Sequence, residues 1–324
     1  MATPDLVTDP TAQKETEATK KVKATITLIF QEVLETETTY SKRLSFATNT
    51  IDSTEPNNDE KTLLEPYRAL SAESGRIVAS LSNPTTTTTL DQKISTFCQA
   101  LNTVNWTTYA TAAIQFPSAS ALFERKFEEV LKDDPDYEFP GGLMGAEHAI
   151  LLVQRGPRYE MLAKELLKNA IKLCSKEDLK AAGLKTDDDF KALLKDYSPP
   201  TEFISESAIN IETLKQLITT FSTIKKGMTN INEAKREAER KAGLASMFPD
   251  EKIALILFNN NLKLNIGLRK EDQPKAAKEL TKAITDGDPE EIAGLLIKYS
   301  FVAAKNKNAA TPDELAKALG SEKK

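Results

Sequence analysis

Apolar residues recur at intervals of three and four along most of the chain, the spacing that places side chains on one face of a helix. The first strong pattern covers residues 22–44, with Ile26, Phe30 and Leu34 on its apolar face. Further patterns predict helices over residues 63–81, 90–103, 107–115, 118–131, 146–173 and 211–241. Long amphipathic helices need tertiary packing along their length, so the pattern favours a helical bundle.

Proline, glycine and capping residues mark where these helices are expected to begin and end. Pro117 separates two of the predicted helices, and Pro157 predicts a kink or a fresh start inside the helix that contains it. Gly243 is a natural stop for the last long helix. Ser175 and Thr186 each precede acidic residues, as N-caps do, and predict two short helices.

The pattern changes beyond the last long helix. Apolar runs at residues 253–258 and 262–268 fit either a hairpin or a helix with a break. Pro274, Pro289 and Pro312 stand at first-turn positions and predict three short helices. The chain is therefore expected to be all-α. Its expected parts are a disordered leader (residues 1–20), a helical domain (21–243) and a small, mainly helical C-terminal domain (244–324).

The composition agrees with a soluble, cytoplasmic helical protein and narrows its chemistry. Glycine is scarce, with 12 in 324 residues, so few positions demand a positive φ. The net charge of −5 gives no general attraction to nucleic acid, and no run approaches the roughly 18 apolar residues of a membrane span. His148 is the single histidine, and Cys98 and Cys174 are expected to be buried free thiols. We therefore expect no metal and no cofactor.

Polar residues on apolar helix faces are the candidate functional residues. Glu37 projects into the apolar sector of the first helix, where a carboxylate is costly to desolvate unless it is paired. It indicates either an internal salt bridge or a carboxylate held ready for a partner protein. Arg155 lies among leucines in its helix, with Gln154 and Arg158 at the border, and an arginine fork suits such interior pairing. Asn232 lies beside the apolar stripe of the last long helix, where an asparagine usually faces water.

Three blocks of sequence match the conserved regions of one family. Residues 36–40 (TETTY), followed by Leu44, resemble the first conserved region of the Dbl-homology domain. Residues 153–159 (VQRGPRY) and the KELLK run at residues 164–168 resemble the third region. Residues 231–239 are similar to the final helix of the family. The blocks occur in the family's order within about two-thirds of the chain.

The resemblance implies an elongated helical bundle of the Dbl-homology type that acts as a guanine-nucleotide exchange factor for a Rho-family small GTPase. Such a protein performs no covalent chemistry, because it speeds GDP release by binding the nucleotide-free GTPase better than the nucleotide-bound form. By carry-over, Glu37 would contact switch I, and Arg158 and Asn232 would contact switch II, with Lys164 as a weaker candidate. The residues expected to support these contacts are Tyr40, Gln154, Arg155 and Tyr159.

Departures from the family pattern leave a second function open. Leu151 and Leu152 stand where many members carry Lys-Pro, Gly156 replaces an aliphatic residue, and Glu160 replaces a proline near the expected GTPase-facing surface. The tail does not show the strands of a pleckstrin-homology domain. A helical scaffold that binds GTPases without exchange is therefore an alternative. The degenerate regions would also suit a bacterial effector acting in a host cytosol.

Two weaker alternatives depend on clusters of charge. Residues 187–189 (DDD) and 133–134 (DD) suggest a metal-dependent hydrolase, but helix N-termini commonly carry such acids. Lys298, Lys305 and Lys307 suggest a tail that contacts a phosphoinositide membrane, but the charge around them is mixed, as on an ordinary solvated face.

Overall fold

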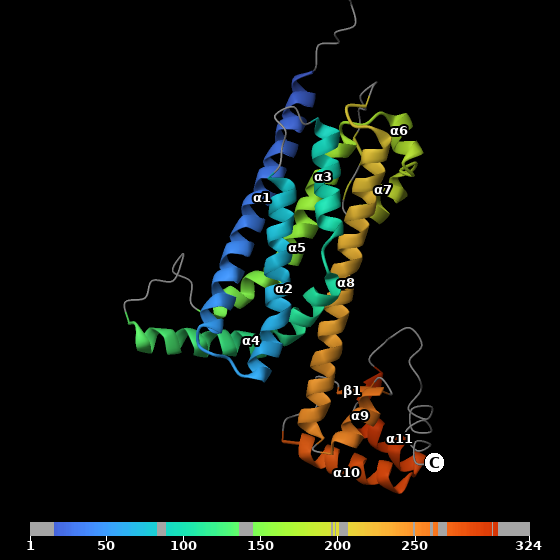
Figure 1. Ribbon diagram of the computed structural model, residues 1–324. Coiled ribbons are helices and arrows are strands. Elements are labelled where there is room, and N and C mark those ends of the chain that lie inside the picture. The colour runs from blue at the N-terminus through green and yellow to red at the C-terminus, as the bar shows by residue number, and fades with distance from the viewer. Residues whose placement is uncertain are drawn as a thin grey trace, which may run out of the picture. The chain divides into compact units, whose positions relative to one another are not determined.

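A computed structural model of the chain describes residues 16–82, 89–135, 145–195, 197, 199–200, 207–248, 250–259, 262–264, 271–299 and 301–303. These residues form helices together with one pair of three-residue strands (Figure 1). The fold is all-α in its main character, as the periodicity predicts. The chain divides into two compact units, Met1–Ile231 and Asn232–Lys324.

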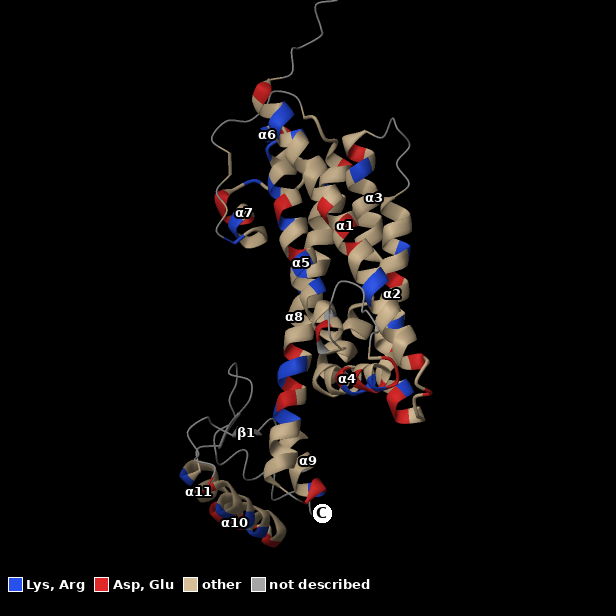
Figure 2. Cartoon of the chain, turned by 90° about the vertical axis from the view of Figure 1, so that its left-hand side faces the viewer, with Lys and Arg blue, Asp and Glu red and all other residues tan. Residues whose placement is uncertain are grey.

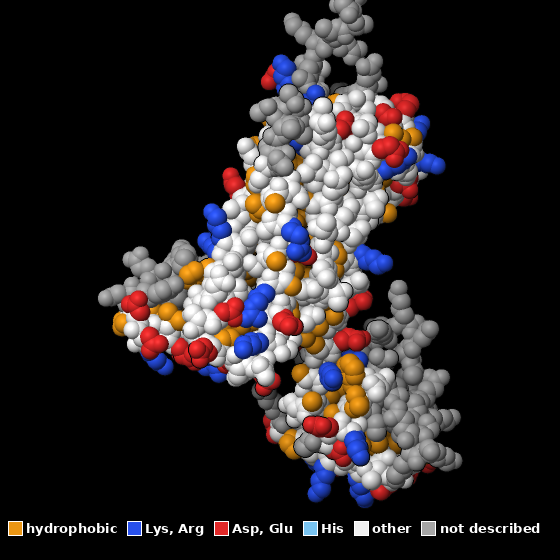
Figure 3. All heavy atoms as spheres, viewed as in Figure 1, with side chains coloured by type: hydrophobic (Ala, Val, Ile, Leu, Met, Phe, Trp, Pro, Cys, Tyr) orange, Lys and Arg blue, Asp and Glu red, His pale blue; other side chains and the backbone are white. Residues whose placement is uncertain are grey.

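The first unit is a bundle of long helices with two short helices beside it. Its elements are α1 (Glu17–Asp52), α2 (Asn58–Leu81), α3 (Leu90–Asn102), α4 (Trp106–Asp133), α5 (Gly145–Ile171), α6 (Lys176–Ala181), α7 (Asp187–Leu193) and the first part of α8 (Ile211–Met247). Helix α1 packs along α2 and α5, and α4 packs against the same two helices across one end of the bundle (Figure 1). On the face shown in Figure 3, acidic and basic side chains of this unit are interspersed with apolar ones.

Buried apolar side chains form two separate clusters in the first unit. The α3-side cluster includes Ile29 and Val33 of α1, Ile77 of α2, Phe97 of α3, Tyr159 and Leu166 of α5 and Phe221 of α8. The α4-side cluster includes Leu44 of α1, Leu70 of α2, Phe123 and Phe127 of α4, Ala149 of α5 and Met228 of α8. Both clusters contain residues of α1, α2, α5 and α8. Burial of the two sets of side chains therefore holds these helices together at two positions along the bundle.

Polar caps explain where several helices begin. The Ser175 hydroxyl accepts a hydrogen bond from the backbone N–H of Asp178, and the Thr186 hydroxyl accepts one from that of Asp189. Each cap satisfies a backbone donor that has no partner inside the helix. Both predicted caps are confirmed, and so are the two short helices that follow them, α6 and α7.

The described residues of the second unit form the end of α8 and three shorter helices. Its further elements are α9 (Glu251–Asn259), β1 (Leu262–Leu264), α10 (Gln273–Asp286), α11 (Pro289–Lys298) and β2 (Phe301–Ala303). Strands β1 and β2 pair antiparallel, with Lys263 opposite Val302. The core of this unit contains Leu244, Phe248, Leu257, Leu280, Ile284, Ile292 and Leu296. Apolar residues from four helices therefore close a small core of their own.

Two predicted boundaries are wrong. Helix α1 begins at Glu17 rather than after residue 20, because the Thr16 hydroxyl caps the backbone N–H of Thr19. Helix α8 does not stop at Gly243 but continues to Met247, since residues beyond the glycine are buried in the core of the second unit. The division between the two compact units falls at residues 231 and 232, inside α8.

The prolines have less effect than the sequence suggests. Helix α4 runs through Pro117 and α5 runs through Pro157 without ending. An internal proline costs one backbone hydrogen bond and about 3 kcal/mol. On either side of Pro117, however, Ala113 and Ala119 are buried in the α4-side cluster. Packing on both sides therefore holds one helix where the periodicity predicts two.

The two apolar runs of the tail form neither a hairpin with each other nor a helix with a break, the two alternatives that the sequence left open. Residues 253–258 lie in α9, whereas residues 262–264 form β1, whose partner is the distant β2 rather than the preceding run. Pro274 and Pro289 stand in the first turns of α10 and α11, as predicted. The helix predicted from Pro312 lies outside the described residues.

Glycines allow two helices to approach their neighbours closely. A Cβ added at Gly227 of α8 would overlap the indole ring of Trp106, and one added at Gly156 of α5 would overlap Met228 Sδ and lie in tight contact with the Tyr109 side chain. By contrast, a Cβ at Gly243 meets nothing within 4 Å. Gly156, a departure from the family pattern, therefore has a packing reason in this chain.

The substitution Gly227→Ala is expected to lower the free energy of unfolding by about 1–3 kcal/mol, because the indole ring cannot yield without moving α4. The matched control on the same helix is Gly243→Ala, which is expected to raise it by up to about 1 kcal/mol through helix propensity alone. Urea denaturation followed by circular dichroism measures both. Equal stability of Gly227→Ala and the unchanged chain would contradict the close approach.

The two cysteines are free and buried, as predicted. Burial raises the pKa of the Cys98 thiol to about 11 and that of Cys174 to about 12. Because the thiolate is the reactive form, both thiols are expected to resist an aromatic disulfide reagent at pH 8 and to react only when the chain unfolds in urea. Rapid labelling of either cysteine in the native protein would show that its helix opens.

Candidate functional site

The segments that resemble the first and third conserved regions lie in α1 and α5, which pack against each other. Arg155 pairs with Glu37, and Arg158 pairs with Glu32. Residue numbers rise along α5 as they fall along α1, so the two helices run antiparallel. One of these ion pairs is fully buried and the other lies at the surface, which gives the helix pair an inner and an outer set of charges.

The inner set is an ionic cluster of Glu37, Glu73 and Arg155. The Arg155 Nη2 atom lies 3.3 Å from Glu37 Oε2 and 3.2 Å from Glu73 Oε1. Arg155 Nε donates a hydrogen bond of 2.6 Å to the Tyr159 hydroxyl. The second carboxylate is anchored further, because Glu73 Oε2 accepts a 2.7 Å hydrogen bond from the backbone N–H of Asn105. The guanidinium thus joins α1, α2 and α5.

The ionic cluster lies at the boundary between the two apolar clusters. Along α1, Glu37 stands between Val33 of the α3-side cluster and Leu44 of the α4-side cluster. Along α2, Glu73 stands in the same way between Ile77 and Leu70. The side chains of Glu37 and Arg155 have no exposed surface. Their charges are therefore stabilised by each other and by hydrogen bonds, and not by water.

The protonation states of the cluster follow from this burial. Burial alone would lower the pKa of Arg155, but the oxygens of Tyr159, Glu37 and Glu73 raise it overall, so the guanidinium stays charged. Burial raises the pKa of Tyr159 well above its ordinary value, although Arg155 opposes the shift. Tyr159 therefore remains a neutral phenol that accepts the hydrogen bond from Arg155.

This placement bears on the role expected for Glu37. Glu37 is 0% exposed and bound to Arg155, so a contact with switch I would require its carboxylate to become accessible, and that contact stays a prediction. The internal salt bridge that periodicity left open for Glu37 is present. The Gln154 side chain is exposed, and Arg155 makes the interior tie between the two segments.

The outer set of charges consists of Arg158 and Glu32. Arg158 Nη2 lies 2.6 Å from Glu32 Oε1, and the two side chains are 44% and 42% exposed. One turn further along each helix lie Leu28 of α1 and Met161 of α5, which are 63% and 46% exposed. The antiparallel register brings these two apolar side chains to the same level of the helix pair. We call the set of Leu28, Glu32, Arg158 and Met161 the α1–α5 face.

The other residues predicted for the site differ in how far they are buried. Lys164 is half-buried on α5, whereas Tyr40 and Tyr159 are buried. Burial, with the Glu37 carboxylate, raises the pKa of Tyr40. Asn232 is exposed in the part of α8 that belongs to the second unit, where acidic and basic residues alternate (Figure 2).

Four residues of these two sets were not predicted from the sequence: Glu73, Glu32, Leu28 and Met161. A signal for Glu73 was present, because it lies three residues after Leu70 and four before Ile77 on one helix face. The same reasoning that selected Glu37 therefore applies to it. Glu32, Leu28 and Met161 could not be predicted in this way, because their proximity on the surface depends on the register of two helices that are distant in sequence.

The acidic run at residues 187–189 has a structural role. Asp187, Asp188 and Asp189 occupy the first turn of α7, where Asp189 Oδ2 accepts hydrogen bonds from the backbone N–H groups of Lys185 and Thr186. These bonds, with that from Thr186 the largest influence, lower the pKa of Asp189. Among the described residues, no three His, Cys, Asp or Glu side chains gather as they do around a metal ion.

The basic residues proposed for membrane contact are only partly described. Lys298 Nζ lies 2.7 Å from Glu279 Oε2, so its charge is already paired, and Lys305 and Lys307 lie outside the described residues. No helix within the described ranges combines the length and the apolar character needed to cross a membrane.

Comparison with known proteins adds no relative. No family model, no curated protein and no solved structure matches the chain. The resemblance to the Dbl-homology family therefore depends on the three sequence blocks alone.

The substitution Arg155→Met is expected to lower the free energy of unfolding by about 3–5 kcal/mol, because it leaves two buried carboxylates without their partner. Arg158→Met, which removes the exposed pair, is expected to cost less than about 1 kcal/mol. Urea denaturation measures both. Adding Glu37→Gln and Glu73→Gln to Arg155→Met should recover part of the loss, and a variant with all three changes that is no more stable than Arg155→Met alone would contradict this account.

Proposed function

We propose that the chain is a guanine-nucleotide exchange factor for a Rho-family small GTPase, and that the GTPase binds the α1–α5 face. The observation that carries the proposal is the pairing of the two family-like segments. These segments are more than a hundred residues apart in sequence, since Arg155 and Glu37 are separated by 118 positions. They nevertheless form one helix pair with an exposed ion pair and exposed apolar side chains.

The chemistry of this face suits a protein partner. Leu28 and Met161 offer apolar contact area, and methionine adapts its shape to the surface that it meets. Arg158 has a planar fork that can exchange Glu32 for a carboxylate or a backbone carbonyl of the partner. Because the Arg158–Glu32 pair is half-exposed, breaking it costs little, and a new contact can replace it.

Exchange then follows from differential binding. The face must contact the nucleotide-free GTPase more favourably than the nucleotide-bound form, because equal affinity for both forms would accelerate nothing. No covalent step and no cofactor are required. The ionic cluster acts from inside, where Arg155 holds α1 and α5 in register so that the surface residues keep their positions. Lys164 and Asn232 remain proposed contacts on the strength of the family resemblance alone.

A second candidate is a scaffold that binds the GTPase without releasing its nucleotide. The burial of Glu37 favours it, because the residue that the family resemblance assigns to switch I is inside the protein. Binding and exchange differ in one measurable respect. A scaffold forms a complex whose stability does not depend on nucleotide, whereas nucleotide expels an exchange factor.

The full chain is expected to accelerate release of a fluorescent GDP analogue from at least one Rho-family GTPase in a panel. Arg158→Glu should lower that rate by about tenfold, the effect of losing one central contact. The matched control is Lys215→Glu, which reverses an equally exposed charge of the pair Lys215–Glu212 on α8 and should leave the rate unchanged.

A charge swap distinguishes a partner contact from an internal one. The double variant Glu32→Arg, Arg158→Glu restores the ion pair with its sign reversed, and should keep the melting temperature while exchange stays low. Recovery of exchange in the double variant would mean that the pair only stabilises the helices. A complex with a GTPase, but no accelerated release from any member of the panel, would overturn exchange in favour of the scaffold.

A further inference from the structure

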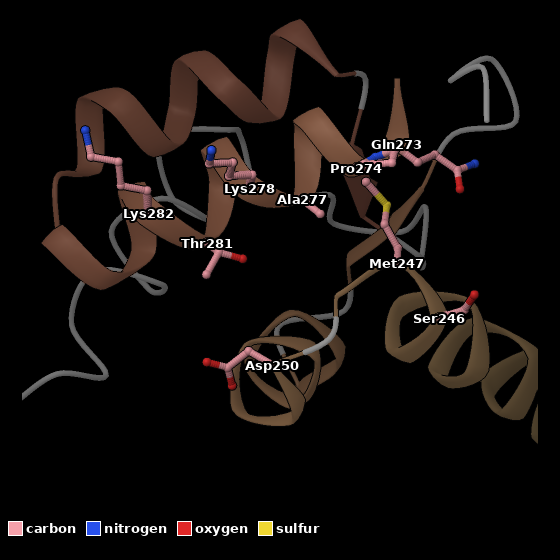
Figure 4. A pocket seen from close by; sticks show the side chains of 9 residues that line it. All are labelled: Ser246, Met247, Asp250, Gln273, Pro274, Ala277, Lys278, Thr281 and Lys282. Carbon is pink, nitrogen blue, oxygen red and sulfur yellow. The ribbon is translucent and has the colours of Figure 1, made fainter. Parts of the chain in front are cut away.

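The second unit contains a pocket that the proposed exchange function does not use. Its volume is about 640 Å³, and the end of α8, the residue before α9 and one face of α10 line it (Figure 4). The described residues that line it are Ser246, Met247, Asp250, Gln273, Pro274, Ala277, Lys278, Thr281 and Lys282. A volume of this size is typical of sites for small organic molecules.

One part of the lining is apolar, with the exposed Pro274 beside the nearly buried Met247 and Ala277. Met247 and Ala277 are 8% and 5% exposed, and the Met247 side chain reaches toward Pro274 in Figure 4. Pro274 and Ala277 are three residues apart and so lie on the same face of α10. This part of the pocket offers an apolar surface to the body of a ligand.

The other part of the α10 lining carries two positive charges. Lys278 and Lys282 are four residues apart, one turn along the same face of α10, and their side chains lie side by side in Figure 4. Like charges at this spacing disfavour the helix slightly. Neither lysine forms an ion pair with another described residue, whereas Lys298 of the same unit is bound to Glu279. The Thr281 hydroxyl, between them in sequence, adds a hydrogen-bond donor to the lining.

The one carboxylate in the lining does not neutralise this pair. Asp250 precedes α9, and its Oδ1 atom accepts hydrogen bonds from the backbone N–H groups of Lys252 at 2.9 Å and Ile253 at 3.4 Å. Its negative charge is thus directed to the start of α9. The α10 side of the pocket keeps an excess of positive charge beside an apolar surface.

We propose that this pocket binds a small amphipathic anion, with its apolar body on Met247, Pro274 and Ala277 and its carboxylate or phosphate head between Lys278 and Lys282. The two parts of the lining require both features in one molecule. An alkyl chain without charge leaves the lysines unpaired, and a bare anion leaves the apolar surface in water. A free metabolite and a monomeric lipid share this chemistry.

Titration calorimetry of the full chain tests the proposal with three ligands of equal chain length, octyl phosphate, octanoate and octanol, and with inorganic phosphate. Octyl phosphate or octanoate should bind saturably at one site, whereas octanol and inorganic phosphate should each bind at least about tenfold more weakly, since each lacks one of the two features. Saturable binding of octyl phosphate alone identifies a phosphate head, and binding of octanoate alone identifies a carboxylate head.

Variants locate the site. Lys278→Glu should weaken binding of the preferred anion by about tenfold, as expected for reversing a charge next to the head group. The exposed Lys235 on α8 offers the control, because Lys235→Glu makes the same charge change outside the lining and should have no effect. Thr281→Trp, at a half-buried position, should fill the pocket and abolish binding while circular dichroism stays unchanged.

Three results would overturn the proposal: no saturable binding of either anion, equal binding of octanol and the preferred anion, or equal losses in Lys235→Glu and Lys278→Glu. The exchange assay is independent of this outcome, because the pocket residues lie in the second unit and the α1–α5 face lies in the first. Failure of one proposal therefore leaves the other unchanged.

Discussion

The first unit depends on the ion pairs that the buried guanidinium of Arg155 forms with the carboxylates of Glu37 and Glu73. Arg155 has no exposed surface, so its charge is stable only where Glu37 of α1 and Glu73 of α2 meet it. Apolar packing tolerates small slips between helices, but an ion pair between two apolar clusters does not, because a slip leaves charges buried and unpaired. The ionic cluster therefore defines one register for α1, α2 and α5, and the apolar clusters on either side supply most of the burial.

That register also determines what the surface presents. Arg155 and Arg158 are three residues apart on α5, so when the first points inward the second emerges beside α1. The meeting of Arg158 with Glu32, and the common level of Leu28 and Met161, follow from the same alignment. Of the charged residues in the family-like segments, Glu37 therefore lies inside the bundle, whereas Arg158 lies on the surface with Glu32, Leu28 and Met161.

The sequence predicted most of the helices and only part of this site. Spacing of three and four residues identified the helices because it reflects which side of each faces a core, and hydroxyl caps such as Ser175 and Thr186 act locally. The errors at Pro117 and Gly243 have one cause, since a helix continues wherever packing beyond the breaker compensates for it. The partner of Glu37 was not predictable, because an apolar sector reveals that a charge needs a partner but not which helix supplies it.

The close approach of Trp106 to Gly227 has an optical consequence. Trp106 is the single tryptophan of the chain, half-buried where α4 meets α8, with its ring centroid 6.5 Å from that of Tyr159, which binds Arg155. Its fluorescence therefore comes from one place, next to the ionic cluster. Any event that shifts α5 or α8 changes the surroundings of that indole. The fluorescence of Trp106 therefore reports on the position of these helices next to the ionic cluster.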